Sequence, residues 1–196
     1  MQTTLSRTLT AFGGTHRIVT GKLVEVARKV KIYLGDHRNA TIVIFDDLTG
    51  QQVELDLRGS EEAVLKRLRE STGTAAAKEI KKTGPGRPKL GVVFREIGLL
   101  PRHWEWLGRQ PGGASVTLRK LVEEAKKKNV ARDDARRAQD AAYRFMSVMA
   151  GDLPLFEEAL RAFYARDAAK FKLLVAAWPK DVREHALKLS ESSLTV

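Results

Sequence analysis

A basic stretch rich in glycine and proline interrupts the chain between Ser71 and Lys89. Its last six residues, 84–89, contain two glycines and two prolines beside Arg87 and Lys89. Glycine and proline break regular secondary structure, and their mixture with basic residues is typical of a flexible linker, not of a core element. We therefore assign residues 73–89 to a linker and expect the folded parts of the chain before and after it.

The net charge of +11 is concentrated in the same region. Residues 73–130 make up less than a third of the 196 residues, yet they have eight more basic than acidic side chains. A localised basic stripe is the feature expected of a protein that binds a polyanion. The alternative is a solvated face that keeps the protein soluble.

Several classes of protein are not expected from this sequence. It has no cysteine, which excludes disulfides, thiol catalysis and thiolate metal sites. We find no secretory signal and no apolar run long enough to span a bilayer, so we expect a cytoplasmic protein without a membrane partner. The four histidines are scattered without metal-ligand spacing, and we expect surface or capping roles for them. We expect no enzyme, cofactor or metal.

The N-terminal third is predicted to be a small α/β unit. Short runs rich in β-branched residues alternate with turn residues, and apolar residues recur at helical spacing between them. Asp46 and Asp47 stand just before Thr49-Gly50, so we expect hairpin-turn roles for these carboxylates, not a metal or acid site. Ser60 is expected to cap a helix. The predicted elements are strands at 7–12, 17–20, 40–45 and 53–57 and helices at 23–34 and 60–69.

The chain after residue 130 is predicted to be entirely helical. Ala135, Ala142, Phe145 and Met149 recur at helical spacing in a helix that ends at Gly151, and shorter helices follow. The predicted fold class is therefore α+β. Its parts are an N-terminal α/β unit (1–72), the linker (73–89), a central strand-helix-helix module (90–129) and a C-terminal helical region (130–196), with helices at 154–164, 168–178 and 179–189.

The central module follows the order strand, helix, glycine turn, helix. The apolar stretch 90–100 predicts a strand, and Pro101 can occupy the first turn of the helix after it. Pro111-Gly112-Gly113 would end this helix, and Ser115 is expected to cap a second helix that runs to about residue 128. An apolar stripe on the second helix contains Leu118, Leu121, Val122 and Ala125.

This order resembles the ribbon-helix-helix family of bacterial repressors and antitoxins. The resemblance rests on Leu99-Leu100-Pro101, on the Gly113-Ala114-Ser115-Val116-Thr117 entry into the second helix, and on the apolar stripe. It implies a homodimer, because a lone strand needs a second chain to satisfy its backbone, and a strand pair that enters the major groove of duplex DNA. A strand and helical hairpin inside one larger core is the alternative.

The resemblance also implies roles for particular residues. Arg95 would read a base edge, although Ile97-Gly98-Leu99-Leu100 blurs the alternation and leaves the strand register open. The start of the second helix, at Ser115 and Thr117, would bind a phosphate with Arg119 and Lys120 nearby. The implied dimer contacts are Ile97, Leu99, Leu118, Leu121 and Val122.

Just before this module, Gly86-Arg87-Pro88 resembles the centre of an AT-hook. An AT-hook places an extended Gly-Arg-Pro in a narrow minor groove, whose negative potential attracts the arginine. Nearby lysines would contact the flanking phosphates. The full set of predicted nucleic-acid contacts is Lys81, Lys82, Arg87, Lys89, Arg95, Arg102, Ser115, Thr117, Arg119 and Lys120.

Motifs spread over most of the chain are similar to a bacterial family known only as a domain of unknown function. This similarity is specific, but it implies no activity. The matching stretches are 45–47, 55–60, 84–90, 99–107, 112–115, 143–146 and 177–179.

The sequence therefore predicts a dimeric protein that binds duplex DNA, as a transcriptional regulator or a nucleoid-associated factor of the cytoplasm. Two alternatives remain open. One is a protein-interaction adaptor of antitoxin type that grips another protein with its N-terminal or C-terminal region. The other is RNA binding through the linker.

Overall fold

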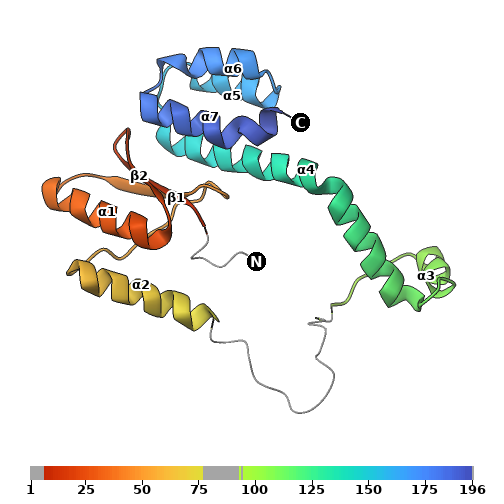
Figure 1. Ribbon diagram of the computed structural model, residues 1–196. Helices are drawn as coiled ribbons and strands as arrows, with labels where there is room; N and C mark the ends of the chain where they lie inside the picture. Colours follow the sequence, from red (N-terminus) through yellow and green to blue (C-terminus); the bar gives the residue numbers. More distant parts are fainter. Residues whose placement is uncertain (1–6, 77–92, 94, 196) are drawn as a thin grey trace. The chain divides into compact units, whose positions relative to one another are not determined.

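The computed structural model describes residues 7–76, 93 and 95–195, and it describes the side chains of these residues except those of 71–76. The described residues form three strands and seven α-helices, so the predicted mixed α+β class is confirmed. The chain divides into two compact units (Figure 1). The first unit contains residues 1–78 and 132–196, and the second contains residues 79–131.

A small antiparallel sheet forms the N-terminal part of the first unit. Strand β1 (Leu9–Gly13) lies between β2 (His16–Gly21) and β3 (Ile42–Asp46). Gly14 makes the tight β1–β2 turn with a φ of 57°, a conformation that glycine adopts at little cost. The sheet therefore confirms the strands predicted on both sides of Gly13-Gly14.

Helices α1 (Leu23–Asp36) and α2 (Glu61–Ala76) accompany the sheet. The buried residues of α1 recur three and four apart, which places them on one face of the helix. The hydroxyl of Ser60 accepts a hydrogen bond from the Ala63 N–H at 3.3 Å, which is the predicted cap. The apolar core beside α1 is formed by Leu9, Ala11, Leu23, Val26, Val30 and Ile44.

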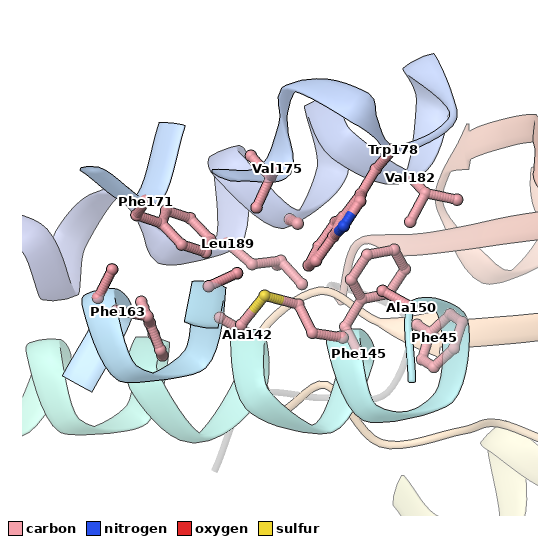
Figure 2. Packing of buried hydrophobic residues seen from close by; sticks show 14 of the residues in the cluster. Phe45, Ala142, Phe145, Ala150, Phe163, Phe171, Val175, Trp178, Val182 and Leu189 are labelled. Carbon is pink, nitrogen blue, oxygen red and sulfur yellow. The ribbon is translucent and has the colours of Figure 1, made fainter. Parts of the chain in front are cut away.

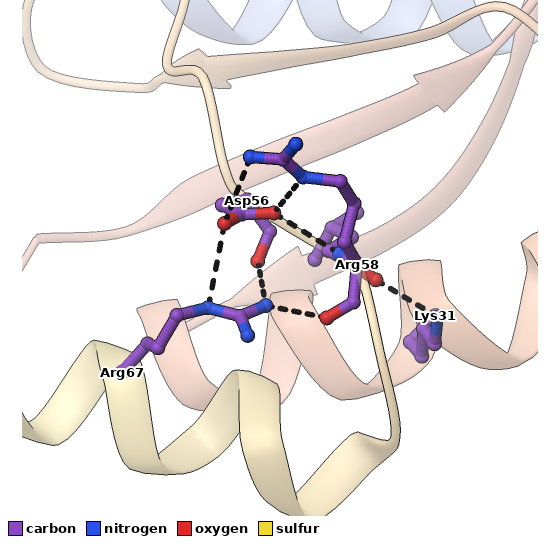
Figure 3. Close-up of polar contacts among 5 residues, drawn as sticks. Lys31, Asp56, Arg58 and Arg67 are labelled. Atoms are coloured by element: carbon purple, nitrogen blue, oxygen red, sulfur yellow. Dashed lines mark hydrogen bonds and ion pairs between the residues drawn. The ribbon is translucent and has the colours of Figure 1, made fainter.

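The strand predicted at 53–57 does not form. Only a bridge between Phe45 and Gln52 continues the pairing, because side chains bind the backbone carbonyls that a further strand would use. The Lys31 ammonium donates to the Leu57 carbonyl at 2.8 Å, and the Arg67 guanidinium donates to the carbonyls of Asp56 and Arg58 (Figure 3). The alternation of apolar and polar residues correctly predicted that Val53, Leu55 and Leu57 would be half-buried. It wrongly predicted that the backbone of this segment would pair as a strand.

The rest of the first unit is helical. It contains the second half of α4 (Gly113–Met149), then α5 (Phe156–Tyr164), α6 (Ala168–Leu174), a short 3-10 turn (Val175–Ala177) and α7 (Lys180–Leu194). These helices surround a core that also contains two sheet residues, Phe12 and Phe45. Figure 2 shows Phe45 in this core close to Phe145. The segments expected as separate domains at 1–72 and 130–196 therefore share one hydrophobic core.

The second unit contains α3 (Pro101–Gly108) and the first half of α4. Two helices were expected at 115–128 and after residue 130, but α4 is continuous. Residues 129–134 contain neither glycine nor proline, so nothing breaks the backbone ladder there. The predicted strand at 90–100 is also absent at residues 93 and 95–100. A lone strand has no hydrogen-bonding partner within one chain, so this segment alone cannot form a ladder.

Among the described residues, no helix combines the length and apolar character needed to cross a bilayer.

Candidate nucleic-acid interface

Helices α3 and α4 form a hairpin at the start of the second unit. Pro101 occupies the first turn of α3 after an extended Leu100, as predicted. Gly112 and Gly113, with φ values of 86° and 73°, make the turn into α4. Leu107 is the buried residue of α3, and Figure 1 shows α3 beside the first turns of α4.

Most predicted contact residues within this unit are exposed. Arg95 lies in the irregular segment before α3, Arg102 lies in the first turn of α3, and Arg119 and Lys120 lie on α4. Ser115 is the third residue of α4 and not its cap, because the helix already begins at Gly113. Thr117 is half-buried. The AT-hook-like segment lies outside the described residues, with Lys81, Lys82, Arg87 and Lys89.

Four more exposed cations lie in the same unit. They are Arg109, at the end of α3, and the run Lys126, Lys127 and Lys128 on α4. The predicted contacts did not include them, although the lysine run is plain in the sequence. Only the basic composition of this run could have indicated that it contacts nucleic acid, because it belongs to no recognised motif.

The cations of the two units differ in their partners. In the first unit, several basic side chains form ion pairs with carboxylates, as in Arg17–Glu184 at 3.2 Å, Arg28–Glu61 at 2.8 Å and Lys188–Asp47 at 2.8 Å, whereas other described cations do not. In the described part of residues 79–131, none of the arginines and lysines forms an ion pair. The eight exposed cations outnumber the four exposed glutamates of these residues, so the unit has a net positive charge.

Three of the five residues predicted to form a dimer interface are exposed in the single chain, and the other two are half-buried. Ile97, Leu121 and Val122 are 55%, 43% and 61% exposed, and Leu99 and Leu118 are half-buried. Leu118 and Val122 also line a shallow hollow of about 290 Å³. The apolar stripe of α4 is thus available to a partner.

The first unit contains a polar cluster at the β3 turn. Asp46 is buried, and its carboxylate accepts hydrogen bonds from the N–H groups of Leu48 and Thr49 at 2.8 and 3.2 Å. The Asp47 carboxylate accepts a hydrogen bond from the Thr10 hydroxyl at 2.7 Å and contacts Lys188. Asp46 therefore has the turn role expected for it, whereas the Asp47 carboxylate connects β1 to α7 and makes no hydrogen bond within the described residues of the turn.

His185, on α7, is completely buried, which corrects the expected surface or capping role. Its ring packs 5.5 Å from Phe12 and 4.6 Å from Phe145, and its Nε2 lies 3.5 Å from the Asp47 carboxylate. Burial lowers the pKa of His185 to about 4, although the Asp47 charge opposes this shift. His185 is therefore a neutral core residue at pH 7.

A cavity of about 600 Å³ lies beside this cluster, between the β3 turn, α4 and α7. Its cations are already balanced, since Arg7 pairs with Asp46, Arg137 with Asp134 and Lys188 with Asp47. Among the described residues, no group of three or more side chains is placed to hold a metal ion. The cavity thus offers neither unbalanced charge nor a recognisable catalytic set.

The exposed pair Asp56 and Arg58 marks the other polar cluster of the first unit (Figure 3). Hydrogen bonds from Arg58 lower the pKa of the Asp56 carboxyl. Because Arg67 and Lys31 bind the adjoining carbonyls, we interpret this cluster as the support of an irregular loop.

The fold and surface define a small α+β protein in which several cations of the first unit form ion pairs, while the described cations of the second unit are exposed and form none. The chain belongs to a family described as an uncharacterized protein conserved in bacteria (DUF2239), whose model matches residues 8–190. This membership confirms the similarity noted in the sequence motifs. No curated protein and no solved structure matches the chain.

Proposed function

We propose that the chain binds duplex DNA through its basic segment, residues 78–128, as a dimeric transcriptional regulator or a nucleoid-associated factor of the cytoplasm. The observation that carries this proposal is the contrast in ion pairing between the two units. The described part of residues 79–131 contains eight arginines and lysines and four glutamates, and none of these cations meets a carboxylate.

Phosphate neutralisation supplies the binding energy in this proposal. Exposed lysines and arginines displace counterions from the DNA, so affinity falls as salt rises. The start of α4 adds free N–H groups and the positive end of the helix dipole after the glycine turn, close to Ser115 and Thr117. Arg95, and Arg87 in the linker, are the proposed readers of base edges and of the minor groove.

Dimerisation is the second part of the proposal. The exposed stripe of Leu121 and Val122, with Leu118 at its edge, would be covered by the same stripe of a second chain. A second chain would also supply the hydrogen-bonding partner that the segment before Pro101 lacks, as in the ribbon-helix-helix pattern.

A gel shift with a 20-base-pair duplex at low and moderate salt tests DNA binding. The informative variant replaces Lys126, Lys127 and Lys128 by glutamine. We expect its affinity to fall more than tenfold at low salt. The slope of log affinity against log salt should flatten by about 0.9 for each phosphate that the variant no longer neutralises.

The matched control replaces Lys170, Lys172 and Lys180 by glutamine, because these exposed lysines of the first unit give the same change in net charge. We expect it to bind DNA like the unmodified protein. Two results would overturn the proposal: no duplex binding below micromolar concentration at low salt, or equally weakened binding in both triple variants.

A protein-interaction adaptor is the second candidate function, favoured by the uncovered apolar residues of the second unit. In that case a pull-down after mild lysis would return one protein and no nucleic acid. Binding of RNA instead of DNA would appear in the gel shift as preferential competition by structured RNA.

A further inference from the structure

The tryptophans of the chain lie in two different environments. Trp178 is 2% exposed, and its indole N–H donates to the Pro154 carbonyl at 2.9 Å. Trp104 and Trp106, on α3, are 43% and 51% exposed. A large aromatic surface left in water is unfavourable and marks a surface that binds something.

Trp106 shares one face of α3 with two arginines. Arg102 precedes it by four residues and Arg109 follows it by three, and residues at these spacings are neighbours on a helix. Arg109 has helical backbone angles, with φ of −84° and ψ of −6°, so the spacing holds to the end of α3. The buried Leu107 is the next residue, about 100° away around the helix axis.

Both guanidinium groups on this face are free of protein partners in the part of the chain that the structure describes. They are separated by seven residues, or about 10 Å along the helix axis. The face therefore places an exposed indole between two cations that form no ion pair with a described residue, although the exposed Glu105, three residues after Arg102 and four before Arg109, is also their neighbour on the helix.

We propose that Trp106 stacks on an unpaired nucleobase while Arg102 and Arg109 bind the phosphates on either side of it. A base presents a flat aromatic surface next to negative charge, which matches this face in both respects. Within a duplex the faces of a base are covered by its neighbours, so this site selects single-stranded nucleic acid. The inference rests on the proposed function, since it requires that the second unit binds nucleic acid.

Trp104 provides a matched control on the same helix. It is exposed to a similar degree, but the residues three and four positions away are Leu100, Pro101, Leu107 and Gly108, none of which is charged. Stacking on Trp104 would therefore lack the flanking phosphate contacts. The buried Trp178 supplies a constant background in fluorescence measurements.

The test is a fluorescence titration of the full chain, at low salt, with a 20-nucleotide oligo(dT) strand and with a blunt duplex of the same length. We expect oligo(dT) to quench the fluorescence of Trp106 and the blunt duplex to leave it unchanged. In Trp106→Leu the quenching should disappear and the affinity for oligo(dT) should fall by about five- to 150-fold, the range expected for one stacked base. Trp104→Leu should retain the affinity within about twofold.

Circular dichroism would verify that both variants keep their helix content. Equally weakened binding in Trp104→Leu and Trp106→Leu, or oligo(dT) binding without quenching, would overturn the stacking proposal. If the duplex binds with the expected salt dependence but oligo(dT) does not bind, the stacking proposal fails and the proposed function stands. If neither strand nor duplex binds, both fail.

Discussion

Gly50 ends the turn after β3 at the point where this turn meets α4. Its N–H donates to the Asp46 carbonyl at 2.7 Å, and Arg144 on α4 donates to the neighbouring Thr49 carbonyl at 2.7 Å. A Cβ at position 50 would lie 2.2 Å from the Ala141 carbonyl oxygen, and the φ of Gly50 is 66°. Glycine is therefore required here both by its backbone conformation and by the packing of the turn on the helix.

We predict that Gly50→Ala lowers the free energy of unfolding by about 2–5 kcal/mol, because a left-handed conformation and an overpacked contact are combined. The control is Gly14→Ala. Gly14 has a φ of 57° but open space around its Cβ position, so only the backbone cost of about 1–2 kcal/mol applies. Urea unfolding of both variants measures the difference. Equal destabilisation of the two variants would contradict the predicted contact with Ala141.

The two aspartates of the same turn show which side-chain contacts can be predicted from the sequence and which cannot. An aspartate that accepts hydrogen bonds from N–H groups two and three residues later is a local interaction, so its turn role could be predicted. The contacts of Asp47 with His185 and Lys188 could not be predicted, because they join residues 138 and 141 positions apart in the chain.

At the scale of the elements, the start of the first helix of the central module and the glycine turn after it were predicted correctly. The length of the second helix was not. Pro101 opens α3 and the glycine pair separates it from α4, since both effects are properties of the backbone. The boundary predicted near residue 130 was wrong, because residues 129–134 contain no helix breaker and α4 continues through them.

The stripe of α4 gives a prediction about assembly. If the stripe joins two chains, Leu121→Glu places a charge in the dimer interface, and the dissociation constant of the dimer should rise more than tenfold. Val130→Glu is the control, because Val130 is 51% exposed on the same helix but lies away from the stripe. Sedimentation velocity at micromolar concentrations measures both. A monomeric unmodified protein, or equal effects of the two variants, would speak against the stripe as the interface.

At the scale of the whole molecule, the first unit is built from the two ends of the chain. Phe12 of β1 and Phe45 of β3 pack with Phe145 of α4, with ring centroids 5.4 and 5.0 Å from that ring. Arg17 at the start of β2 also pairs with Glu184 on α7 at 3.2 Å. The sheet and the C-terminal helices are therefore expected to unfold together.

His185 lies between the sheet and the helices of the first unit, where its ring packs on Phe12 and Phe145. Protonation of His185 should therefore destabilise this packing. Its pKa is about 4 in the folded protein and 6.5 as a free side chain, so the unfolded chain binds the proton more readily. The contribution of His185 to stability is complete above pH 6.5 and is lost as the pH falls towards 4, at up to about 1.4 kcal/mol per pH unit.

We therefore expect the free energy of unfolding to fall between pH 7 and pH 5. His185→Gln should be less stable at pH 7 but should show a shallower slope over the same interval. Urea unfolding at several pH values measures both slopes. The same slope in the variant and in the unmodified protein would show that other groups cause the dependence.

The sequence by itself determined the α+β class, most of the helices, the turns at Gly13-Gly14 and Asp46, and the concentration of positive charge in one segment. Each of these follows from backbone preferences or side-chain spacing within a few residues. Only the tertiary structure decided that the N-terminal sheet and the C-terminal helices share a core, that His185 is buried, and that the described cations of residues 79–131 meet no carboxylate. The first two features depend on contacts between residues far apart in the chain, and the third depends on the absence of such contacts; local patterns specify neither.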